Sequence, residues 1–434
     1  MYTKIHCCRI CGNERLETLL TLGEQTLTGV FPKDAAEHIE SMPIELVKCT
    51  GQSVCGLVQL QHSCTPEKMY GMNYGYRSGI NASMVRHLED IHVQAMMMGN
   101  PQEGDIILDI GSNDATLLKL YDGARFILVG MDPTGVKFRH YYPKNVTLVP
   151  DFFSAENFRH VFGDKKAKII TSIAMFYDLE KPQRFVHQIA SVLADDGVWI
   201  FEQSYLPSML QATAYDTICH EHLEYYALRQ ITWLLERADM DILDVSLDVT
   251  NGGSFRVTAV KKVHPAFTGR SPKAVALLRE EEKWGIDDSA IYATFKERVF
   301  THKYELRKLL AQLHAEGKTV FGLGASTKGN VILQFCEIST RDLPCIAEVN
   351  EDKFGSCTPG THIPIVSQEE ADSQNPDYYL VLPWHFREGI LQGMSRYIDG
   401  GGKLIFPLPE LAIVSPRVLG VTDRNPVSSL THQP

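Results

Sequence analysis

The stretch GDIILDIGSNDATLLKLY, residues 104–121, decides the fold of this chain of 434 residues. Its apolar run at 105–110 has the length of a buried strand, and it enters a turn at Gly111 that is followed by a pattern typical of a helix. A strand that meets a glycine-containing turn and then a helix is the first unit of many nucleotide-binding sheets. The stretch therefore predicts an α/β sheet with a ligand at the carboxyl end of this strand.

The same alternation continues after this stretch. A second strand, FILVGMD, ends at Asp132. Three further apolar runs follow, with helical patterns between them, at 146–153, 168–176 and 198–204. Alternating strands and helices imply parallel strands joined by crossover helices, so we expect a doubly wound sheet. Two later runs, 240–249 and 254–262, are separated by NGG and predict a hairpin.

A second α/β unit begins after a predicted long helix at 288–315. The stretch KTVFGLGASTKGNVILQF, residues 318–335, again takes a strand into a glycine-rich turn and a helix. KLIFPLP, residues 403–409, is expected to close this second sheet. The predicted fold class is α/β, with two Rossmann-like open sheets preceded by a small metal-binding module that is short in regular structure. The expected domains are 1–80, 81–285, 286–415 and a polar tail, 416–434.

Composition argues against several classes of protein. The chain has 42 Lys and Arg against 53 Asp and Glu, a net charge of −11. Binding to nucleic acid needs clustered Lys and Arg, so we expect no nucleic-acid partner. No uninterrupted apolar run reaches membrane-spanning length, and MYTKIHCCRICG lacks the pattern of a signal peptide. We therefore expect a cytoplasmic enzyme with reduced thiols and no membrane partner, as a monomer or small homo-oligomer.

Six of the ten cysteines lie in the first 64 residues. In a reducing compartment such a cluster predicts metal ligation before disulfides. A CxxC knuckle and a later, more widely spaced pair would complete a zinc site, and the expected ligands are Cys8, Cys11, Cys49 and Cys55. Four thiolates leave no open coordination position, so the zinc would be structural. Cys7 and Cys64 are rival ligands, and a set of free buried thiols is the alternative.

The turn DIGSND, residues 109–114, lacks the third glycine of a dinucleotide fingerprint, which disfavours NAD. It suits S-adenosylmethionine, which has no pyrophosphate to cradle. Asp132 is placed for ribose hydroxyls, and Asp151 with Phe152 for the edge and face of adenine. Any one of these Asp residues alone is also a common helix cap. The expected cofactor-binding residues are Ser78, Asp109, Gly111, Ser112, Asn113, Asp132, Pro133, Asp151 and Phe152.

The turn GLGASTKGN, residues 322–330, offers backbone amides, hydroxyls and one cation at a helix start, which favours a phosphate group. Its spacing differs from that of a Walker loop, and a tight strand-to-helix turn is the alternative interpretation. Side chains at neighbouring strand ends and near NGG are expected to line the same crevice. The expected substrate-binding residues are Gly253, Arg256, Ser326, Thr327, Lys328, Asn330, Asn350 and Trp384.

The segment CHEHLEYY, residues 219–226, combines two histidines, a glutamate and two tyrosines. Histidine titrates near neutral pH and a neighbouring carboxylate can tune it, which indicates acid/base chemistry. The two histidines are two residues apart, so the spacing of a zinc-protease helix is absent. The alternative is that His220 and His222 are ordinary structural polar residues.

In this order, CRICG, the Cys pair before GLVQL, YGMNYGYRSG, DIGSND, CHEHLEYY, NGGSFRV and FGLGASTKGN resemble the three-part C-methyltransferases that act on nucleotide-linked deoxysugars. The resemblance runs from about residue 7 to 407. It implies a zinc-binding module, a central S-adenosylmethionine domain and a C-terminal domain that helps to hold the nucleotide sugar. The chain departs from the family at Cys219, where Tyr is common, at the wider Cys pair, and at Phe176 or Tyr177, where the family has a histidine.

Methylation of carbon needs a carbanion equivalent, which a 4-keto sugar supplies at C-3 as an enolate. We expect His222, with Glu221 beside it, to take the C-3 proton. Tyr76, with His220 as a second candidate, would donate a hydrogen bond to the enolate oxygen, and Tyr74 is adjacent in the pattern. The predicted activity is S-adenosylmethionine-dependent C-3 methylation of a nucleotide-linked 4-keto-deoxyhexose. An O- or N-methyltransferase of another small metabolite and an inactive zinc-containing binding scaffold are the alternatives.

Overall fold

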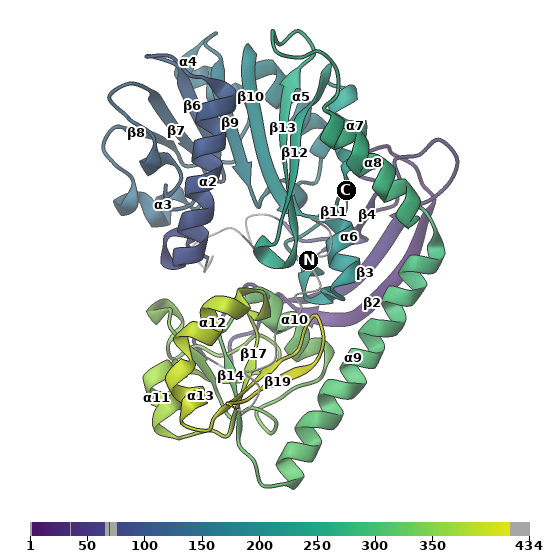
Figure 1. Ribbon diagram of the computed structural model, residues 1–434, viewed down its shortest axis with the longest axis vertical. Coiled ribbons are helices and arrows are strands. Elements are labelled where there is room, and N and C mark those ends of the chain that lie inside the picture. The colour runs from purple at the N-terminus through teal and green to yellow at the C-terminus, as the bar shows by residue number, and fades with distance from the viewer. Residues whose placement is uncertain (1, 35, 66–68, 70–75, 417–434) are drawn as a thin grey trace.

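The computed structural model describes residues 2–34, 36–65, 69 and 76–416, and over this range it shows a central sheet, a C-terminal sheet and an N-terminal module (Figure 1). The long helix α9, Ser289–Ala315, runs from the central part to the C-terminal part. Tyr74 and the predicted tail beyond residue 416 lie outside the described residues. In the described chain, no helix combines the length and the apolar character that crossing a membrane requires.

The strands of the central sheet stand in the order β12-β13-β10-β9-β6-β7-β8. Their bounds are β6 Ile106–Ile110, β7 Ile127–Met131, β8 Val146–Val149, β9 Ala167–Ile173, β10 Leu193–Ser204, β12 Met240–Asp248 and β13 Ser254–Lys261. Strands β6 to β10 are parallel, and β13 is antiparallel to both of its neighbours, which confirms the predicted hairpin. The strand order reverses at β6, between β7 and β9, and ligands bind beyond the carboxyl ends of strands at such a switch point.

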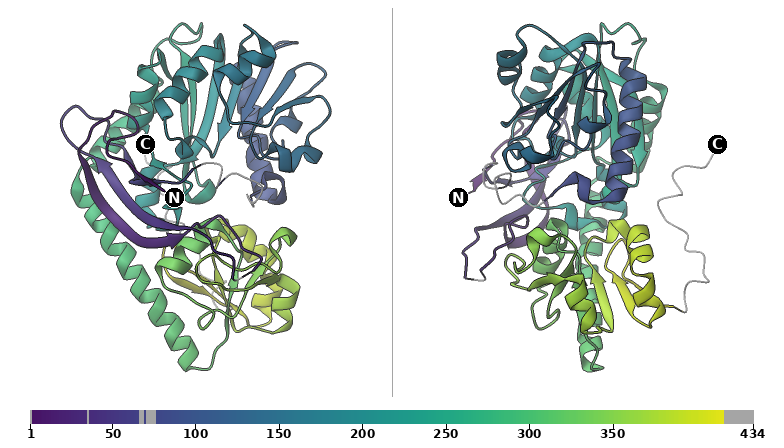
Figure 2. Two further views of the ribbon diagram at one scale, coloured as in Figure 1. Left: turned by 180° about the vertical axis from the view of Figure 1, so that it is seen from behind. Right: turned by 90° about the vertical axis from the view of Figure 1, so that its left-hand side faces the viewer.

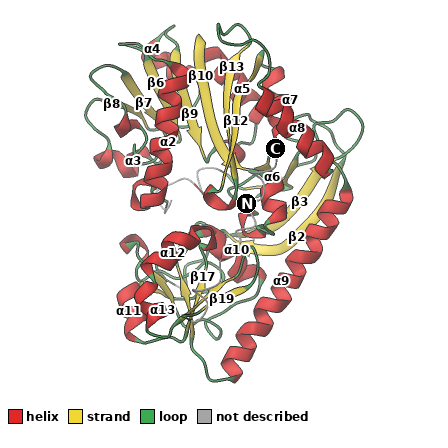
Figure 3. Cartoon of the chain, in the orientation of Figure 1, coloured by secondary structure: helices red, strands yellow, loops and turns green. Residues whose placement is uncertain are grey.

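Helices cover both faces of this sheet (Figure 3). Helix α2, Ala82–Gly99, places apolar residues at helical spacing, from Met84 through Leu88 to Ile91, against one face. Its N-cap is Asn81, whose side chain accepts from the amide of Ser83. The other helices of the central part are α3 Gly135–Phe138, α4 Ala155–Phe162, α5 Pro182–Val192, α6 Leu206–Gln211, α7 Leu228–Glu236 and α8 Pro272–Trp284.

The segment after β6 differs from the prediction of a turn at Gly111 followed by a helix. It forms turns and then a short 3₁₀ helix, Leu118–Leu120. Asn113 and Ala115 have φ of 47° and 61°, a left-handed backbone that interrupts the repeating hydrogen bonds of a right-handed helix. The prediction was wrong because polar side chains at 112–116 bond locally and hold an open turn instead.

The N-terminal module contains far more regular structure than we predicted. Long strands β2, Leu16–Thr26, and β3, Ser41–Cys49, pair antiparallel, and β4, Val58–Leu60, adds to β3. The next strand of this sheet is β11, Glu224–Tyr225, which belongs to the CHEHLEYY segment. The shorter strands β1, Thr3–Lys4, and β5, His62–Ser63, pair separately. The module is therefore joined by backbone hydrogen bonds to the segment that carries the predicted catalytic histidines.

The C-terminal sheet has the strand order β16-β15-β14-β17-β18-β19. Its strands are β14 Val320–Leu323, β15 Ile346–Glu348, β16 Ile365–Ser367, β17 Tyr378–Val381, β18 Lys403–Phe406 and β19 Ala412–Val414. Its helices are α10 Thr327–Phe335, α11 Gln368–Ser373, α12 Arg387–Gly393 and α13 Ser395–Asp399. KLIFPLP does form β18, but β19 returns antiparallel beyond it, so the prediction that it closes the sheet was wrong by one strand.

The three parts meet around residues 219–226. Strands β2 and β3 descend from the central part to the C-terminal part, as the view from behind shows (Figure 2). At their lower end the Thr26 amide donates to Gln334 of α10, 2.8 Å away, and the Gln334 amide group donates back to the Thr26 carbonyl at 3.0 Å. The module thus bridges the two sheets on the side of the molecule where the predicted site residues converge.

Candidate active site

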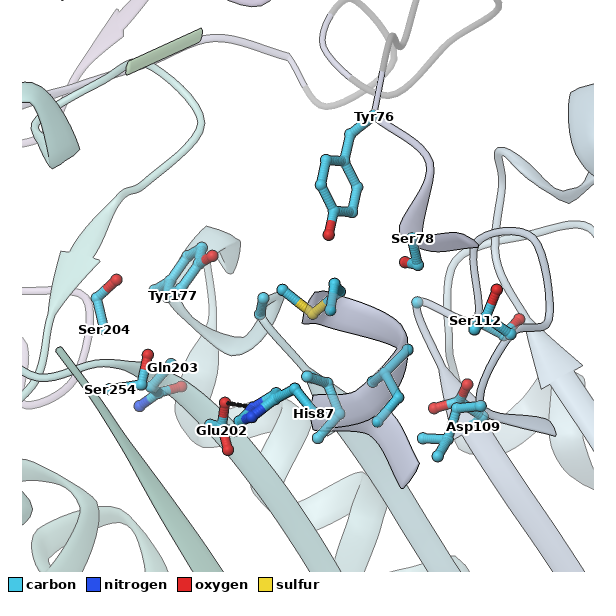
Figure 4. Close-up of a pocket in the computed structure, with 17 residues that line it drawn as sticks. Tyr76, Ser78, His87, Asp109, Ser112, Tyr177, Glu202, Gln203, Ser204 and Ser254 are labelled. Atoms are coloured by element: carbon cyan, nitrogen blue, oxygen red, sulfur yellow. Dashed lines mark hydrogen bonds and ion pairs between the residues drawn. The ribbon is translucent and has the colours of Figure 1, made fainter. Parts of the chain in front are cut away.

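A cavity lies at the carboxyl ends of β6, β9 and β10 (Figure 4). The empty space in and above it is about 610 Å³, counting the part open to solvent. Five of the residues predicted from the sequence line it: Tyr76, Ser78, Asp109, Gly111 and Ser112. The structure therefore brings the β6 turn and the Tyr76–Ser78 segment together, as a cofactor pocket requires.

Asp109 is the most perturbed carboxyl group of this cavity. Burial raises its pKa to about 7, and the nearby charge of Asp132 adds to the effect. The Thr171 hydroxyl donates a 2.6 Å hydrogen bond to Asp109 and opposes part of the shift. Gly111 follows with φ of 73°, a conformation that favours glycine, and lets the chain turn past Met175.

The Asp132 carboxylate stabilises the turn after β6 by accepting hydrogen bonds. Its Oδ2 accepts a 2.7 Å hydrogen bond from the Asn113 amide, and its Oδ1 accepts from the amide and hydroxyl of Thr134, both at 2.6 Å. The Asn113 side chain in turn accepts from the Ser78 amide at 3.0 Å and donates to the Tyr76 carbonyl at 3.2 Å. This chain of bonds places Tyr76 over the cavity.

Asp151 and Phe152 follow β8, at the side of the switch point where adenine was expected. The Asp151 carboxylate accepts from the Phe152 amide at 2.7 Å and from the Asn157 side chain at 3.0 Å. Phe152 is 40% exposed. Among the described residues neither lines the cavity, and the same holds for Pro133. Their contact with the cofactor stays a prediction.

His222 lies behind a lining residue of the cavity and, among the described residues, does not line the cavity itself. Its ring packs against Tyr177, a lining residue, with 4.3 Å between ring centroids. The imidazole Nδ1 lies 2.9 Å from the Thr217 carbonyl, which can only accept, so Nδ1 carries the hydrogen and Nε2 keeps a lone pair. Burial lowers the pKa of His222 to about 3, with a further contribution from the charge of Lys328. The ring is therefore neutral at physiological pH.

Glu221 and His220 point toward the N-terminal module. The Thr28 hydroxyl donates to Glu221 at 3.4 Å, and the Glu221 side chain packs so closely on Gly29 that a Cβ there would clash. The Thr28 amide also donates to His220 at 3.4 Å, and burial lowers the pKa of His220 to about 4. We expected Glu221 to orient His222, but the Thr217 carbonyl makes that contact instead. In the described part of the chain, His220 does not line the cavity.

The glycine-rich turn of the C-terminal sheet reaches the same segment. The Trp384 indole donates a 2.8 Å hydrogen bond to Asp216, a fully buried carboxyl group just before CHEHLEYY. Burial lowers the pKa of Lys328, while the charges of Asp216 and Cys219 oppose the shift. Lys328 and Trp384 therefore lie near the segment that carries His222, and their contact with substrate stays a prediction.

The other predicted substrate residues are engaged in contacts of their own. Asn330 donates to the Thr28 carbonyl at 2.7 Å, and the Asn350 side chain accepts from the Asp352 amide at 3.2 Å. The Ser326 hydroxyl caps α10 by accepting from the Gly329 amide, next to Thr327. Gly253 has φ of 117° and packs against Ser208. Whether any of them also contacts substrate stays a prediction.

Sequence reasoning missed a charged pair at the floor of the cavity. His87 Nε2 and Glu202 Oε1 are 2.5 Å apart, and Arg256, predicted to bind substrate, donates to Glu202 Oε2 at 2.8 Å. Two signals were available. His87 interrupts the apolar stripe of α2. Glu202 follows the apolar run VWIF near the carboxyl end of its strand, as Asp109 does in IILDI.

The thiol cluster of the N-terminal module fits a zinc ion. The ligand atoms of Cys8, Cys11, Cys49 and Cys55 lie within 4.8 Å of one another, the four residues that we predicted. Three Sγ pairs are 3.4–3.5 Å apart, close to the roughly 3.8 Å separation that tetrahedral Zn–S bonds of about 2.3 Å require. The Asn13 side chain donates to Cys49 Sγ at 3.2 Å, as outer-sphere groups do around metal thiolates. Cys7 and Cys64 are outside this group.

Comparison with known proteins agrees with this architecture. Family models match in sequence order, as a zinc binding domain over 8–70, a methyltransferase domain over 74–245 and a C-methyltransferase C-terminal domain over 249–409. The chain is 28% identical to the C-methyltransferase NovU of Streptomyces niveus over 413 aligned residues. The aligned region covers 94% of this chain and 96% of that protein.

Solved structures show weaker likenesses. Magnesium protoporphyrin IX methyltransferase from Synechocystis PCC 6803 is 14% identical over 45% of this chain and 88% of its own, with a TM-score of 0.32. An S-adenosylmethionine-dependent methyltransferase from Clostridium acetobutylicum is 13% identical over 41% and 92%, also with a TM-score of 0.32. The ordered family matches, the α/β sheets and the four-thiol site place the chain in the family of S-adenosylmethionine-dependent C-methyltransferases with a zinc-binding N-terminal module.

Proposed function

We propose that this enzyme methylates C-3 of a nucleotide-linked 4-keto-deoxyhexose, with His222 as the general base. One observation carries the proposal. His222 lies against Tyr177 of the cofactor cavity. The charge of Lys328, in the glycine-rich turn of the C-terminal part, also contributes to the lowered pKa of His222. A substrate between the two would hold its sugar carbon near the methyl donor and its phosphates near Lys328 and the start of α10.

The reaction would proceed in two steps, proton removal and then methyl transfer. His222 Nε2 takes the C-3 proton, and the electron pair of the C–H bond moves into an enolate that ends on the C-4 oxygen. The C-3 carbon then attacks the methyl group of S-adenosylmethionine, and the pair of the S–CH₃ bond stays on sulfur. The products are the C-3-methylated keto sugar and S-adenosylhomocysteine, and the proton on His222 is released to solvent.

Lys328 supports a substrate-dependent strengthening of this base. Its positive charge is one of the causes of the low pKa of His222, after burial. A bound diphosphate would neutralise Lys328 and remove that part of the effect, which raises the basicity of His222 only when substrate is present.

Tyr76 supports stabilisation of the enolate. Tyr76 as a residue is 46% exposed, but its hydroxyl points down into the cavity (Figure 4). Burial raises the pKa of this hydroxyl to about 12, so it remains a hydrogen-bond donor at neutral pH. A donor aimed at the developing oxyanion lowers the barrier to proton removal. His220 is the less suitable donor, because its ring faces Thr28 and Met42.

Hydrogen exchange tests the proposal. Incubation with a nucleotide-linked 4-keto-deoxyhexose in deuterated water, without S-adenosylmethionine, should place deuterium at C-3, and added cofactor should convert that position to C–CH₃. Transfer of the methyl group to oxygen or nitrogen, with no exchange, would establish the O- or N-methyltransferase alternative instead.

A cytoplasmic location and a monomer or small homo-oligomer belong to the same proposal, because an activated sugar of this kind is a metabolite of the cytoplasm.

A further inference from the structure

A buried charge network forms the floor of the cofactor cavity. Glu202 is 3% exposed. Its Oε1 lies 2.5 Å from His87 Nε2, and its Oε2 accepts a 2.8 Å hydrogen bond from Arg256 Nε. The second ring nitrogen of His87 lies 3.2 Å from the Thr250 hydroxyl and 3.9 Å from Asp248. Burial favours neutral His87, but the bond to Glu202 and its charge outweigh burial and raise the pKa. The carboxylate is thus fixed from both sides while it faces the cavity.

Gln203, the next residue of β10, gives an independent sign of a ligand. Its side chain is 2% exposed and lines the cavity. Within the described residues, neither its Nε2 nor its Oε1 has a hydrogen-bond partner. An unpaired buried amide is costly, on both the donor and the acceptor side. The site is therefore built for a molecule that supplies both an acceptor and a donor next to a carboxylate.

We propose that Glu202 and Gln203 bind the methionine end of S-adenosylmethionine through its positive charge, and that His87 and Arg256 are positioning residues for Glu202. The methionine end carries an α-ammonium, an α-carboxylate and the sulfonium. Its ammonium can donate to Glu202 and to the Gln203 carbonyl oxygen, and its carboxylate can accept from the Gln203 amide. The charges of His87 and Arg256 offset the negative charge of Glu202, so the floor of the cavity does not repel the α-carboxylate of the methionine end.

The layout of the cavity supports this orientation. Asp109 and Ser112 lie at one side of the cavity, beside β7, and Glu202, Gln203 and Ser204 lie at the other side (Figure 4). Adenosine at the carboxyl ends of β6 and β7 leaves the rest of the cofactor to extend over β9 toward β10. An opposite charge in a water-poor pocket is then worth more than it would be in bulk solvent. The inference concerns the cofactor alone and stands whatever the methyl acceptor is.

Calorimetric binding of three ligands to the whole enzyme and to Glu202→Gln tests the inference. S-adenosylmethionine carries sulfonium and ammonium, S-adenosylhomocysteine carries ammonium alone, and 5′-methylthioadenosine carries neither charge. We expect S-adenosylmethionine to bind about tenfold more weakly to the variant, about 1.4 kcal/mol, and methylthioadenosine to bind equally well. If S-adenosylhomocysteine binding weakens in parallel, Glu202 contacts the ammonium, and if it does not, Glu202 contacts the sulfonium.

Two outcomes would overturn the inference. One is an equal loss for all three ligands, which would mean a general collapse of the pocket, and the other is no loss for any of them. Gln203→Leu, which removes both hydrogen-bonding groups, should weaken both amino-acid-bearing ligands and leave methylthioadenosine unchanged. His87→Gln should reproduce a smaller version of the Glu202→Gln pattern, because it moves the carboxylate without removing it.

The matched control is Glu281→Gln. Glu281 is also a buried carboxylate, 3% exposed, but it accepts from Tyr205 and from the amides of Leu228 and Arg229 outside the cavity. Its loss should lower the melting temperature while leaving the ratio of the three affinities unchanged. A charge-dependent affinity pattern in Glu281→Gln as well would show that the effect is not local to Glu202, and would defeat the inference.

Discussion

The imidazole ring of His222 lies against the phenol ring of Tyr177, with 4.3 Å between the two centroids. Through this contact His222 borders the cavity that Tyr177, Asp109 and Gly111 line. His220, two residues earlier, faces Thr28 of the N-terminal module. The two histidines of CHEHLEYY are therefore in different environments, and they should respond differently to substitution.

We predict that His222→Gln lowers the rate of methyl transfer by about 100-fold or more, the typical contribution of a general base. Affinity for S-adenosylhomocysteine should stay within about twofold, because the ring stands behind Tyr177 and not in the cavity. Single-turnover transfer of a labelled methyl group and calorimetry measure the two effects. His220→Gln is the matched control and should lower the melting temperature more than the rate. A similar loss of rate in both variants would contradict the separate roles.

Asp109 predicts an unusual dependence of stability on pH. Its pKa rises to about 7 on folding because burial favours the neutral acid. The stabilising effect is complete below the unfolded pKa near 4 and is lost as the pH rises through 7. The full difference is on the order of 4 kcal/mol, of which about 2.5 kcal/mol falls between pH 5 and pH 8.

Asp109→Asn removes this titration, so the cofactor-free variant should gain stability relative to the natural enzyme as the pH rises from 5 to 8. Urea unfolding at the two pH values measures the gain. Asp151→Asn, at an exposed carboxylate after β8, is the control. An equal gain in both variants, or a gain at pH 5 instead of pH 8, would contradict the prediction.

The hydrogen bond from Trp384 to Asp216 predicts coupling between the C-terminal part and the catalytic segment. Trp384→Phe leaves the buried carboxyl group without its donor, which costs about 1–3 kcal/mol. We expect a KM for the nucleotide sugar that is about tenfold higher, with a smaller change in kcat, because Lys328 and the segment before His220 lose their common support. Steady-state kinetics with varied sugar measure the two constants.

Trp233→Phe is the control for this substitution. Trp233 is on α7, and its indole nitrogen has no hydrogen-bond partner among the described residues. Its replacement should leave the KM for the sugar unchanged. If Trp384→Phe changes kcat and not KM, the indole acts on the chemical step and the proposed support of the substrate is wrong.

The sequence allowed a good prediction of both open sheets because their strands are apolar runs with clear ends. Asp109 could be found at the end of such a run, and the same rule would have found Glu202. What the sequence could not show is pairing between distant segments. Glu224 and Tyr225 form a strand only because β4 offers its edge, 165 positions earlier at Gln59. That pairing joins the CHEHLEYY segment to the N-terminal module.

The local chemistry of CHEHLEYY was equally beyond reach from the sequence. A glutamate next to a histidine suggested that Glu221 orients His222, but neighbours along an extended or turning chain point apart. The partner of His222 is a backbone carbonyl, at Thr217, which no side-chain pattern announces. The four zinc ligands were predictable for the opposite reason, since CxxC spacing is set by the geometry of the metal itself.

The zinc site should support catalysis through β11. Cys49 ends β3, which pairs with β4, and β4 pairs with Glu224 and Tyr225 just after His222. We predict that Cys11→Ser reduces bound zinc and lowers the melting temperature by about 10 °C, because structural zinc supplies roughly 10 kcal/mol of folding free energy and only part of it is lost. The rate of methyl transfer should fall with the zinc content, since the catalytic segment loses the edge that fixes it.

Zinc analysis, thermal unfolding and activity on one preparation measure all three. Cys7→Ser, at an exposed cysteine outside the cluster, is the control. Full activity in a zinc-free Cys11→Ser enzyme would show that β11 holds its position without the metal.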